Sequence, residues 1–195
     1  DEEVLRDSLS WLLESRDVKC DSFASGEAFI AALPALPQDL PSCSILDMRM
    51  GAGMSGIELF QRMPEIAHQW PVIFLSGHGD ITLAVTAVKH GAFDFLEKPF
   101  ADNQLVDRVL EALKLSKQRL STFNQSEVIR DKLNLLSPRE LDVMDGILSG
   151  QANRDIANDL GMAVRTVEVH RASIFKKMNV KGAVELINLL QVLEV

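Results

Sequence analysis

The first half of this sequence alternates short apolar segments with segments of helical periodicity, and this alternation restricts the fold more than any other feature. Apolar segments occupy residues 44–46, 71–75 and 93–96, whereas residues 4–13, 57–63 and 103–116 have the spacing of helices. Continuous apolar strands separated by helices are typical of a parallel sheet that helices bury on both faces. The first half is therefore predicted to be an α/β domain with a doubly wound parallel sheet.

The second half has no strand pattern and is predicted to contain four short helices. Ser137-Pro138-Arg139-Glu140 has the form of a capping box with proline at the first helical position, and Gly150 ends that helix. Asn153 is predicted to cap the second helix, and the third and fourth span residues 164–178 and 183–193. Two helices joined by a tight turn with glycine form a helix-turn-helix, so this half is predicted to be an all-α domain of that kind.

A polar stretch separates the two halves. Residues 117–134 are rich in glutamine, serine, threonine and asparagine. Such a stretch is predicted to be a linker that is partly helical. The predicted organisation is an N-terminal domain at 1–113, a linker at 114–134 and a C-terminal domain at 135–195.

Charge also differs between the halves. The net charge of −8 divides into −10 over residues 1–113, with 8 basic and 18 acidic side chains, and +2 over residues 114–195, with 12 basic and 10 acidic side chains. Residues 162–181 hold five basic side chains and one acidic side chain, Glu168. Basic residues gathered on one helix are typical of a surface that binds nucleic acid, and equally of a solvated helix face.

The cysteines and the hydropathy pattern indicate the compartment. Cys20 and Cys43 have no metal-binding spacing, so they are predicted to be free thiols rather than a disulfide or a metal site. No apolar run approaches the roughly 20 residues that a membrane span needs, and no signal peptide is visible. These features predict a cytoplasmic protein without a membrane partner.

Three predicted strands end in residues suited to phosphoryl chemistry, namely Asp47, Ser76 and Lys98. Parallel strands place their carboxyl ends at one edge of the sheet, so these side chains are predicted to lie close together. A carboxylate accepts a phosphoryl group when a cation and hydrogen-bond donors offset the charge of the incoming oxygens. Mg²⁺ suits this work because it binds few carboxylates and keeps positions open for phosphate oxygens. The acidic residues at positions 1–3 are candidates for a second carboxylate.

Four motifs follow one another in the first half: Ile45-Leu46-Asp47-Met48-Arg49-Met50, Met54-Ser55-Gly56, Leu75-Ser76-Gly77-His78-Gly79-Asp80 and Phe95-Leu96-Glu97-Lys98-Pro99-Phe100. Together they make residues 1–113 resemble the receiver domain of two-component response regulators. The resemblance implies a five-stranded flavodoxin-like sheet with Asp47 as the phosphoacceptor.

Further roles follow from the same resemblance. Mg²⁺ would be held by Asp1, Asp47 and the backbone carbonyl of Arg49, while Glu2 stays open as a ligand. Lys98, which would precede a cis peptide bond to Pro99, would pair with the phosphoryl group. Ser76 and Phe95 would form a switch pair, in which the hydroxyl moves toward the phosphoryl oxygen and the ring turns inward.

The sequence departs from the receiver pattern in two places. It begins at Asp1, without the first strand and the acidic residue that precede this position in the family, so we expect that strand to belong to a longer chain. The loop Met50-Gly51-Ala52-Gly53-Met54 is one residue longer than usual and lacks its proline. A freer backbone in this loop is expected to change the rates of phosphorylation and hydrolysis.

Residues 135–195 carry a second set of motifs: Leu136-Ser137-Pro138-Arg139-Glu140, Asn153-Arg154-Asp155-Ile156-Ala157, Arg165-Thr166-Val167-Glu168-Val169-His170-Arg171 and Lys176-Lys177-Met178. They resemble the four-helix DNA-binding domain of the LuxR type. The resemblance implies that the third helix enters the major groove. Its candidates for contact with bases are Arg165, Thr166, Glu168, Val169, Arg171 and Ala172. The candidates for contact with phosphates are Asn153, His170, Lys176 and Lys177.

Several of these candidates have competing interpretations. Lys176 and Lys177 also suit a solvated helix end, where cations favour the helix dipole. Glu168 repels DNA unless it accepts a hydrogen bond from a cytosine amine. Ala163 stands where a capping serine or threonine is usual, which is expected to cost the third helix about 0.5 to 2 kcal/mol.

The two-domain order resembles the FixJ and NarL class of regulators and implies a phosphorylation-controlled transcriptional regulator rather than an enzyme. Its expected partners are a sensor histidine kinase, double-stranded promoter DNA, a second copy of the chain after phosphorylation, and RNA polymerase. A phosphatase of the haloacid dehalogenase type is disfavoured, because it needs a second aspartate where this chain has Arg49. A DNA-binding protein whose receiver is a phosphorylation-independent interaction module stays open.

Overall fold

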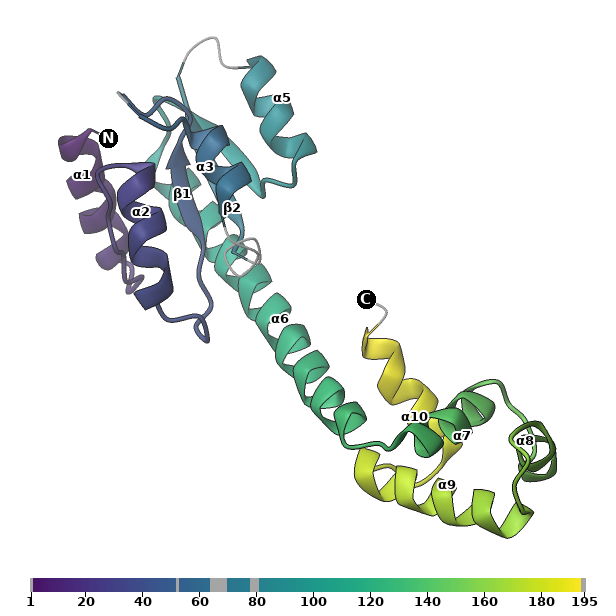
Figure 1. The fold of residues 1–195 in the computed structure, drawn as a ribbon. Coiled ribbons are helices and arrows are strands. Elements are labelled where there is room, and N and C mark those ends of the chain that lie inside the picture. The colour runs from purple at the N-terminus through teal and green to yellow at the C-terminus, as the bar shows by residue number, and fades with distance from the viewer. Residues whose placement is uncertain (1, 52, 64–69, 78–80, 194–195) are drawn as a thin grey trace. The chain divides into compact units, whose positions relative to one another are not determined.

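The structure is a computed structural model that describes residues 2–51, 53–63, 70–77 and 81–193. The chain divides into two compact units, residues 1–120 and 121–195 (Figure 1). Within the described ranges, no helix combines the length and the apolar character that crossing a bilayer requires.

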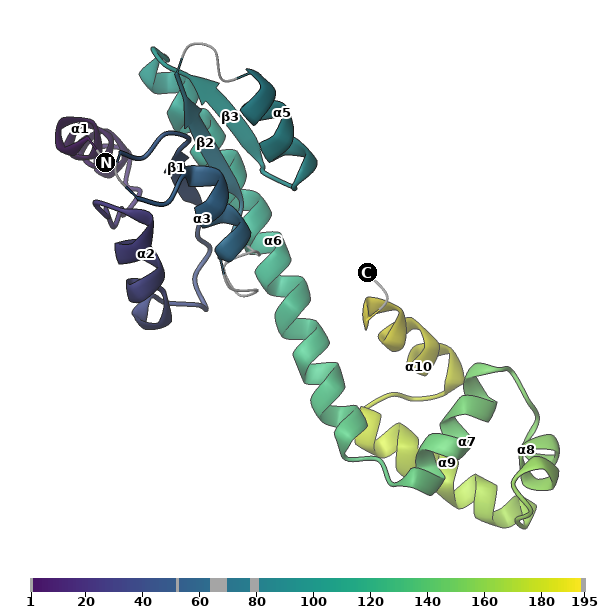
Figure 2. The same ribbon diagram turned by 45° about the horizontal axis from the view of Figure 1, so that its top comes forward.

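The N-terminal unit contains a parallel sheet, as the alternating pattern predicts. Its strands β1 (Ser44–Asp47), β2 (Val72–Ser76) and β3 (Asp94–Glu97) lie in the order β1-β2-β3 (Figure 2). The described residues form three strands of this sheet.

Helices cover both faces of this sheet, which confirms the doubly wound prediction. Alternate residues of β2 point to opposite faces. Val72 and Phe74 belong to one buried cluster, which includes side chains of α2 (Gly26–Ala32) and α3 (Gly56–Arg62), and Ala87 of α5 (Ile81–Lys89). Ile73 and Leu75 belong to another, which includes side chains of α1 (Glu3–Glu14) and α6 (Asp102–Asn134).

Two helices of this unit differ from the sequence expectations. No helix was predicted at α2, although Ser25 marks its start by accepting a hydrogen bond from the amide of Ala28. Helix α6 continues to Asn134, well beyond the predicted end near Ser116. Residues 102–134 contain neither glycine nor proline, so their polar composition reflects exposure rather than the end of a helix.

The cysteines are free, as predicted. Burial raises the pKa of the Cys43 thiol to about 12 and also raises that of Cys20. Neither thiol is therefore prepared for nucleophilic chemistry.

The C-terminal unit is entirely helical in its described residues. After the end of α6 it contains α7 (Pro138–Leu148), α8 (Asn153–Asp159), α9 (Val164–Met178), α10 (Ala183–Leu190) and a short 3₁₀ helix, η2 (Gln191–Leu193). The capping box at α7 and the bounds of α9 confirm the predictions. The prediction that Asn153 caps α8 is wrong, because Asn153 is the first helical residue and Ala152, which has no side-chain acceptor, occupies the cap.

The core of this unit consists of apolar side chains from every long helix. Val143, Ile156, Val167 and Leu186 are at most 1% exposed and represent α7, α8, α9 and α10 in turn. Ile129 of α6 belongs to the same cluster. A Cβ atom on Gly146 would lie 2.7 Å from Cγ1 of Ile156, so the close contact of α7 and α8 depends on this glycine. This packing holds α8 and α9 as a helix-turn-helix.

Candidate functional site: a sheet-edge carboxylate and an exposed helix

The predicted phosphoryl site is assembled around Asp47, at the carboxyl end of β1. Oδ2 of Asp47 accepts a hydrogen bond from Nζ of Lys98 at 2.6 Å, and Oδ1 accepts one from the amide of Arg49 at 3.1 Å. Both side chains of the ion pair are largely buried, with exposed fractions of 14% for Asp47 and 25% for Lys98. The peptide bond between Lys98 and Pro99 is cis. The edge therefore presents a carboxylate with a cation beside it.

The chain after Asp47 returns close to the backbone of that residue. Helix α3 begins so near β1 that a Cβ atom on Gly56 would lie 2.1 Å from the carbonyl oxygen of Asp47, which excludes any side chain at this position. Ser55 and Glu58 form a reciprocal capping box at the start of α3. Oε1 of Glu27, on α2, accepts a hydrogen bond from the amide of Met54 at 3.0 Å. These contacts fix both the start of α3 and the end of the longer loop.

The predicted switch residues lie on the two neighbouring strands. Ser76 ends β2, one residue beyond the partner of Asp47 in the ladder, and is 3% exposed. Phe95 lies on β3 opposite Phe74 and is 42% exposed. The phenylalanine ring is thus partly on the surface in this structure.

The predicted metal ligands are only partly described. Asp1 lies outside the described residues, and the described residues contain no group of three histidine, cysteine or acidic side chains able to hold a metal ion. Glu2 and Asp47 line the same cavity of about 480 Å³. Carboxylate and carbonyl oxygens are the ligands that Mg²⁺ prefers, so the donor types present here fit that ion.

Helix α9 has one buried and one exposed face. The residues predicted for the apolar face are 0% exposed: Val167, Ile174 and Met178. Six candidates for DNA contact are exposed: Arg165, Thr166, Glu168, Val169, Ala172 and Lys176. The other four are partly buried: Asn153, His170, Arg171 and Lys177. The guanidinium of Arg171 lies over the ring of Phe175, 5.5 Å from its centroid.

Glu168 is paired within the helix. Its Oε2 atom accepts a hydrogen bond from Nη1 of Arg165 at 2.9 Å, one turn earlier. Both side chains are solvent-exposed, so the pair stabilises the helix weakly. It does place a carboxylate acceptor beside a guanidinium on the exposed face of α9.

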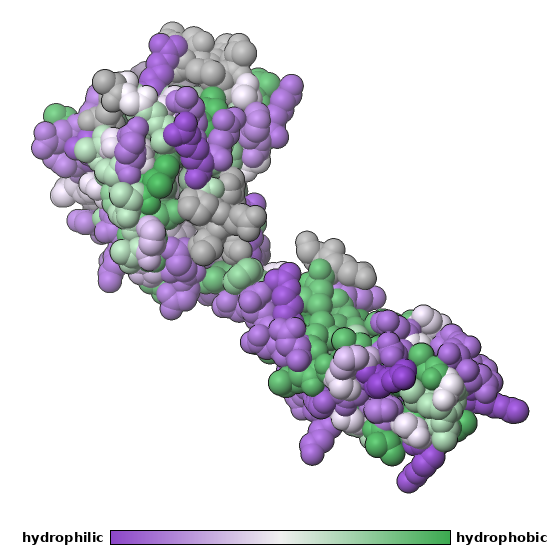
Figure 3. Space-filling model, in the orientation of Figure 1, coloured by the Kyte–Doolittle hydropathy of each residue, from purple (hydrophilic) through white to green (hydrophobic). Residues whose placement is uncertain are grey.

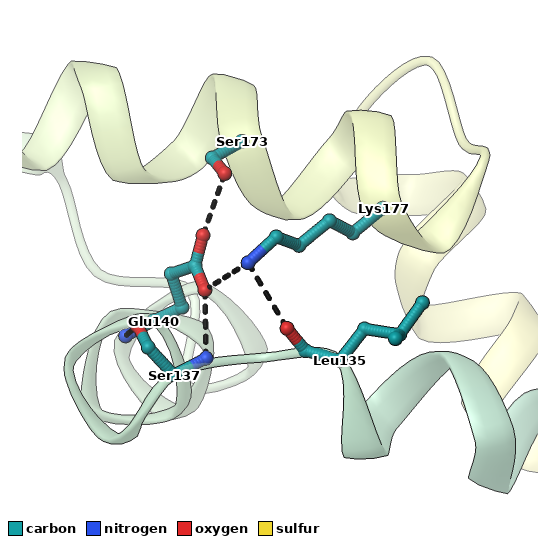
Figure 4. A network of polar contacts seen from close by, with 5 residues as sticks. All are labelled: Leu135, Ser137, Glu140, Ser173 and Lys177. Atoms are coloured by element: carbon teal, nitrogen blue, oxygen red, sulfur yellow. Dashed lines mark hydrogen bonds and ion pairs between the residues drawn. The ribbon is translucent and has the colours of Figure 1, made fainter.

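A buried network of polar contacts joins α7 to α9 (Figure 4). Glu140, which is 4% exposed, accepts hydrogen bonds from Nζ of Lys177 at 2.7 Å and from Oγ of Ser173 at 2.6 Å. Sequence reasoning found the capping-box bond between Ser137 and Glu140 but missed these contacts. The signal was available, since Ser173 and Lys177 are four residues apart and therefore share one side of α9.

A parallel sheet with a lysine-paired aspartate at its carboxyl edge, joined in one chain to a helix-turn-helix, is the arrangement expected of the class of response regulators that bind DNA. Comparisons with known proteins agree with this class. Residues 1–110 match the family described as Response regulator receiver domain, and residues 134–190 match Bacterial regulatory proteins, luxR family.

Relatives and solved structures match almost the whole chain. It is 38% identical to the transcriptional regulatory protein FixJ of Bradyrhizobium diazoefficiens, over 97% of this chain and 90% of that protein. It is 43% identical to the C4-dicarboxylate transport transcriptional regulatory protein DctR of Rhodobacter capsulatus, over 95% and 93%. The structure of the response regulator StyR has a TM-score of 0.81 at 34% identity, covering 97% and 94%. Full-length FixJ from B. japonicum has a TM-score of 0.59 at 38% identity, covering 98% and 93%.

The chain belongs to the response regulators that combine a receiver domain with a LuxR-type DNA-binding domain. This is a family of transcriptional regulators. A receiver domain implies a sensor kinase as a partner, and a LuxR-type domain implies DNA.

Proposed function

We propose that Asp47 receives a phosphoryl group from a sensor histidine kinase and that this phosphorylation controls the binding of promoter DNA by α9. The observation that carries the proposal is the 2.6 Å contact between Lys98 and Asp47 at the carboxyl edge of the sheet. The lysine offsets the charge of the carboxylate and of the incoming phosphoryl oxygens. The aspartate oxygen attacks phosphorus, the bond between phosphorus and the kinase histidine nitrogen breaks, and an acyl phosphate forms on Asp47.

Mg²⁺, when bound, would offset negative charge on the transferred group. Asp1, Asp47 and the backbone carbonyl of Arg49 would hold it, and Glu2, which lines the cavity beside Asp47, is a further carboxylate within this region. The amide of Arg49 keeps Oδ1 of Asp47 in place, so the chain's own backbone orients the carboxylate.

Phosphorylation would be transmitted through Ser76 and Phe95 and would favour pairing of two chains. The exposed ring of Phe95 lies in a domain whose α5 and α6 also expose apolar side chains, Val85, Val88 and Leu110. In the C-terminal unit, apolar residues gather over α10 (Figure 3), where Val184 is 72% exposed. Burial of such surfaces drives association. A two-fold dimer would bind two related half-sites.

Arg165, Thr166, Glu168, Val169, Arg171 and Ala172 would read bases, and Asn153, His170 and Lys176 would contact phosphates. The protein would act in the cytoplasm, where the regulated promoter lies. RNA polymerase would be a further partner at that promoter. Lys177 is not among these phosphate contacts, because its ammonium has partners within the domain.

The test is intact-protein mass spectrometry of the full chain after incubation with acetyl phosphate and Mg²⁺. We expect one phosphoryl adduct, which Asp47→Asn abolishes and Asp39→Asn, a change at an exposed loop aspartate, preserves. Circular dichroism establishes that each variant is folded. The absence of an adduct on folded wild-type protein would overturn the proposal. An adduct that leaves DNA binding unchanged would instead favour the phosphorylation-independent receiver.

A further inference from the structure

Lys177 differs from its neighbour Lys176 although both were predicted to contact DNA phosphates. Lys176 is exposed, whereas the ammonium of Lys177 is 2.7 Å from Oε2 of Glu140 and 3.0 Å from the carbonyl oxygen of Leu135. Its side chain is 34% exposed, and that of Glu140 is 5% exposed. An ammonium has three donors, and two of them are already used inside the domain.

These contacts join three segments of the chain at one point (Figure 4). Glu140 is on the first turn of α7, Lys177 is on the last turn of α9, and Leu135 follows the end of α6. Ser173 adds a second bond from α9 to Glu140 at 2.6 Å. In addition, Nζ of Lys132, on α6, donates to the carbonyl oxygen of Met178 at 3.3 Å.

We propose that Lys177 is a positioning residue, which with Glu140 fixes the orientation of the DNA-reading helix α9 against α7 and the end of α6, and that it does not bind a DNA phosphate. Moving Lys177 to a phosphate would leave the Glu140 carboxylate buried without its cation, a costly state. Lys177 therefore stays paired with Glu140, whose nearly buried carboxylate accepts hydrogen bonds from two residues of α9. This inference rests on the proposed role of α9 in binding DNA.

The salt dependence of DNA binding separates a phosphate contact from a positioning role. Each phosphate contact releases counterions, so its loss lowers the slope of log K against log salt concentration by about 1. Loss of a positioning residue weakens binding without this change. We expect Lys177→Met to weaken binding about tenfold with an unchanged slope, and Lys176→Met to weaken binding while lowering the slope by about 1.

A double variant provides a second test. Lys177→Met leaves the Glu140 charge unpaired, whereas Glu140→Gln with Lys177→Met leaves no unpaired buried charge. The double variant is therefore expected to bind DNA more tightly than Lys177→Met alone. Lys177→Arg, which keeps the charge and offers donors of similar reach, is expected to restore most of the affinity.

The experiment uses the full chain and a duplex selected by the wild-type protein from a random-sequence pool, with affinity measured by fluorescence anisotropy at several salt concentrations. Circular dichroism confirms folding at the assay temperature. A slope lowered by Lys177→Met as much as by Lys176→Met, or an unchanged affinity, would overturn the positioning role. If no duplex is selected, or if changes at Arg165 and Lys176 leave binding unchanged, the proposed role of α9 itself fails.

Discussion

Nζ of Lys98 lies 2.6 Å from Oδ2 of Asp47, a residue 51 positions earlier in the sequence. The pair joins the ends of two strands separated by β2, so it exists only when the parallel sheet is formed. Lys98→Met is expected to slow formation of the phosphoryl adduct about 100-fold, because the cation that stabilises the transferred oxygens is lost. Lys89→Met, at an exposed position near the end of α5, is the control and should leave the rate unchanged. The measurement is a time course of adduct mass, and equal rates for the two variants would contradict a role for Lys98.

Much of this site followed from the sequence because strand ends are local signals. An apolar run that stops at Asp47, Ser76 or Lys98 places these residues at one edge once the strands are known to be parallel. The contacts made by Glu27 and Glu140 did not follow, because each links elements far apart in the sequence. Glu27 reaches the amide of Met54, 27 residues away, and Glu140 reaches Lys177, 37 residues away.

Some helices were predicted with their bounds, whereas the end of another was missed. The bounds of α9 were predicted because apolar residues recur along it at helical spacing and an asparagine, Asn179, follows it. In the structure Asn179 adopts the left-handed conformation that ends the helix. The end of α6 was missed because residues 117–134 lack an apolar stripe over most of their length. Ile129 and Leu133 of that stretch pack against the C-terminal core, and two core positions are too few for periodicity to reveal.

Glu168 offers a test of base reading by α9. Its carboxylate lies 2.9 Å from the guanidinium of Arg165, so Glu168→Ala frees the arginine and removes a negative charge from the exposed face of α9. We expect tighter binding to all duplexes and a loss of discrimination at one base pair of about 1 to 3 kcal/mol. Selection of duplexes from a random pool measures the preference at each position. Asp142→Ala breaks a comparable ion pair with Arg139 on α7 and is the control. An unchanged base preference would exclude Glu168 from sequence reading.

The network around Glu140 predicts how stability depends on pH. Hydrogen bonds from the Lys177 ammonium, the backbone amide of Ser137 and the hydroxyl of Ser173 lower the pKa of Glu140 from 4.5 to about 2. Because the pKa is lower in the folded state, the contribution of the ionised Glu140 carboxylate to stability is complete above the unfolded pKa of 4.5. This contribution is lost as the pH falls toward about 2. The difference in unfolding free energy between wild type and Glu140→Gln should therefore shrink over that range. Denaturant titrations followed by circular dichroism measure it, and a difference independent of pH would show that the carboxylate charge is not responsible.

The missing cap of α9 predicts a stabilising substitution. Ala163 occupies the N-cap with φ −72° and ψ 145° and has no side-chain acceptor for the amides of the first turn. Ala163→Ser supplies that acceptor in a compatible backbone conformation and is expected to raise the unfolding free energy of the C-terminal domain by about 1 kcal/mol. Ala31→Ser, at an exposed position within α2, is the matched control and should be slightly destabilising, because serine inside a helix has a lower propensity than alanine. Differential scanning calorimetry measures both changes. A melting temperature that does not rise for Ala163→Ser would mean that the amides of the first turn of α9 already have adequate partners in solvent, and that the alanine costs this helix nothing.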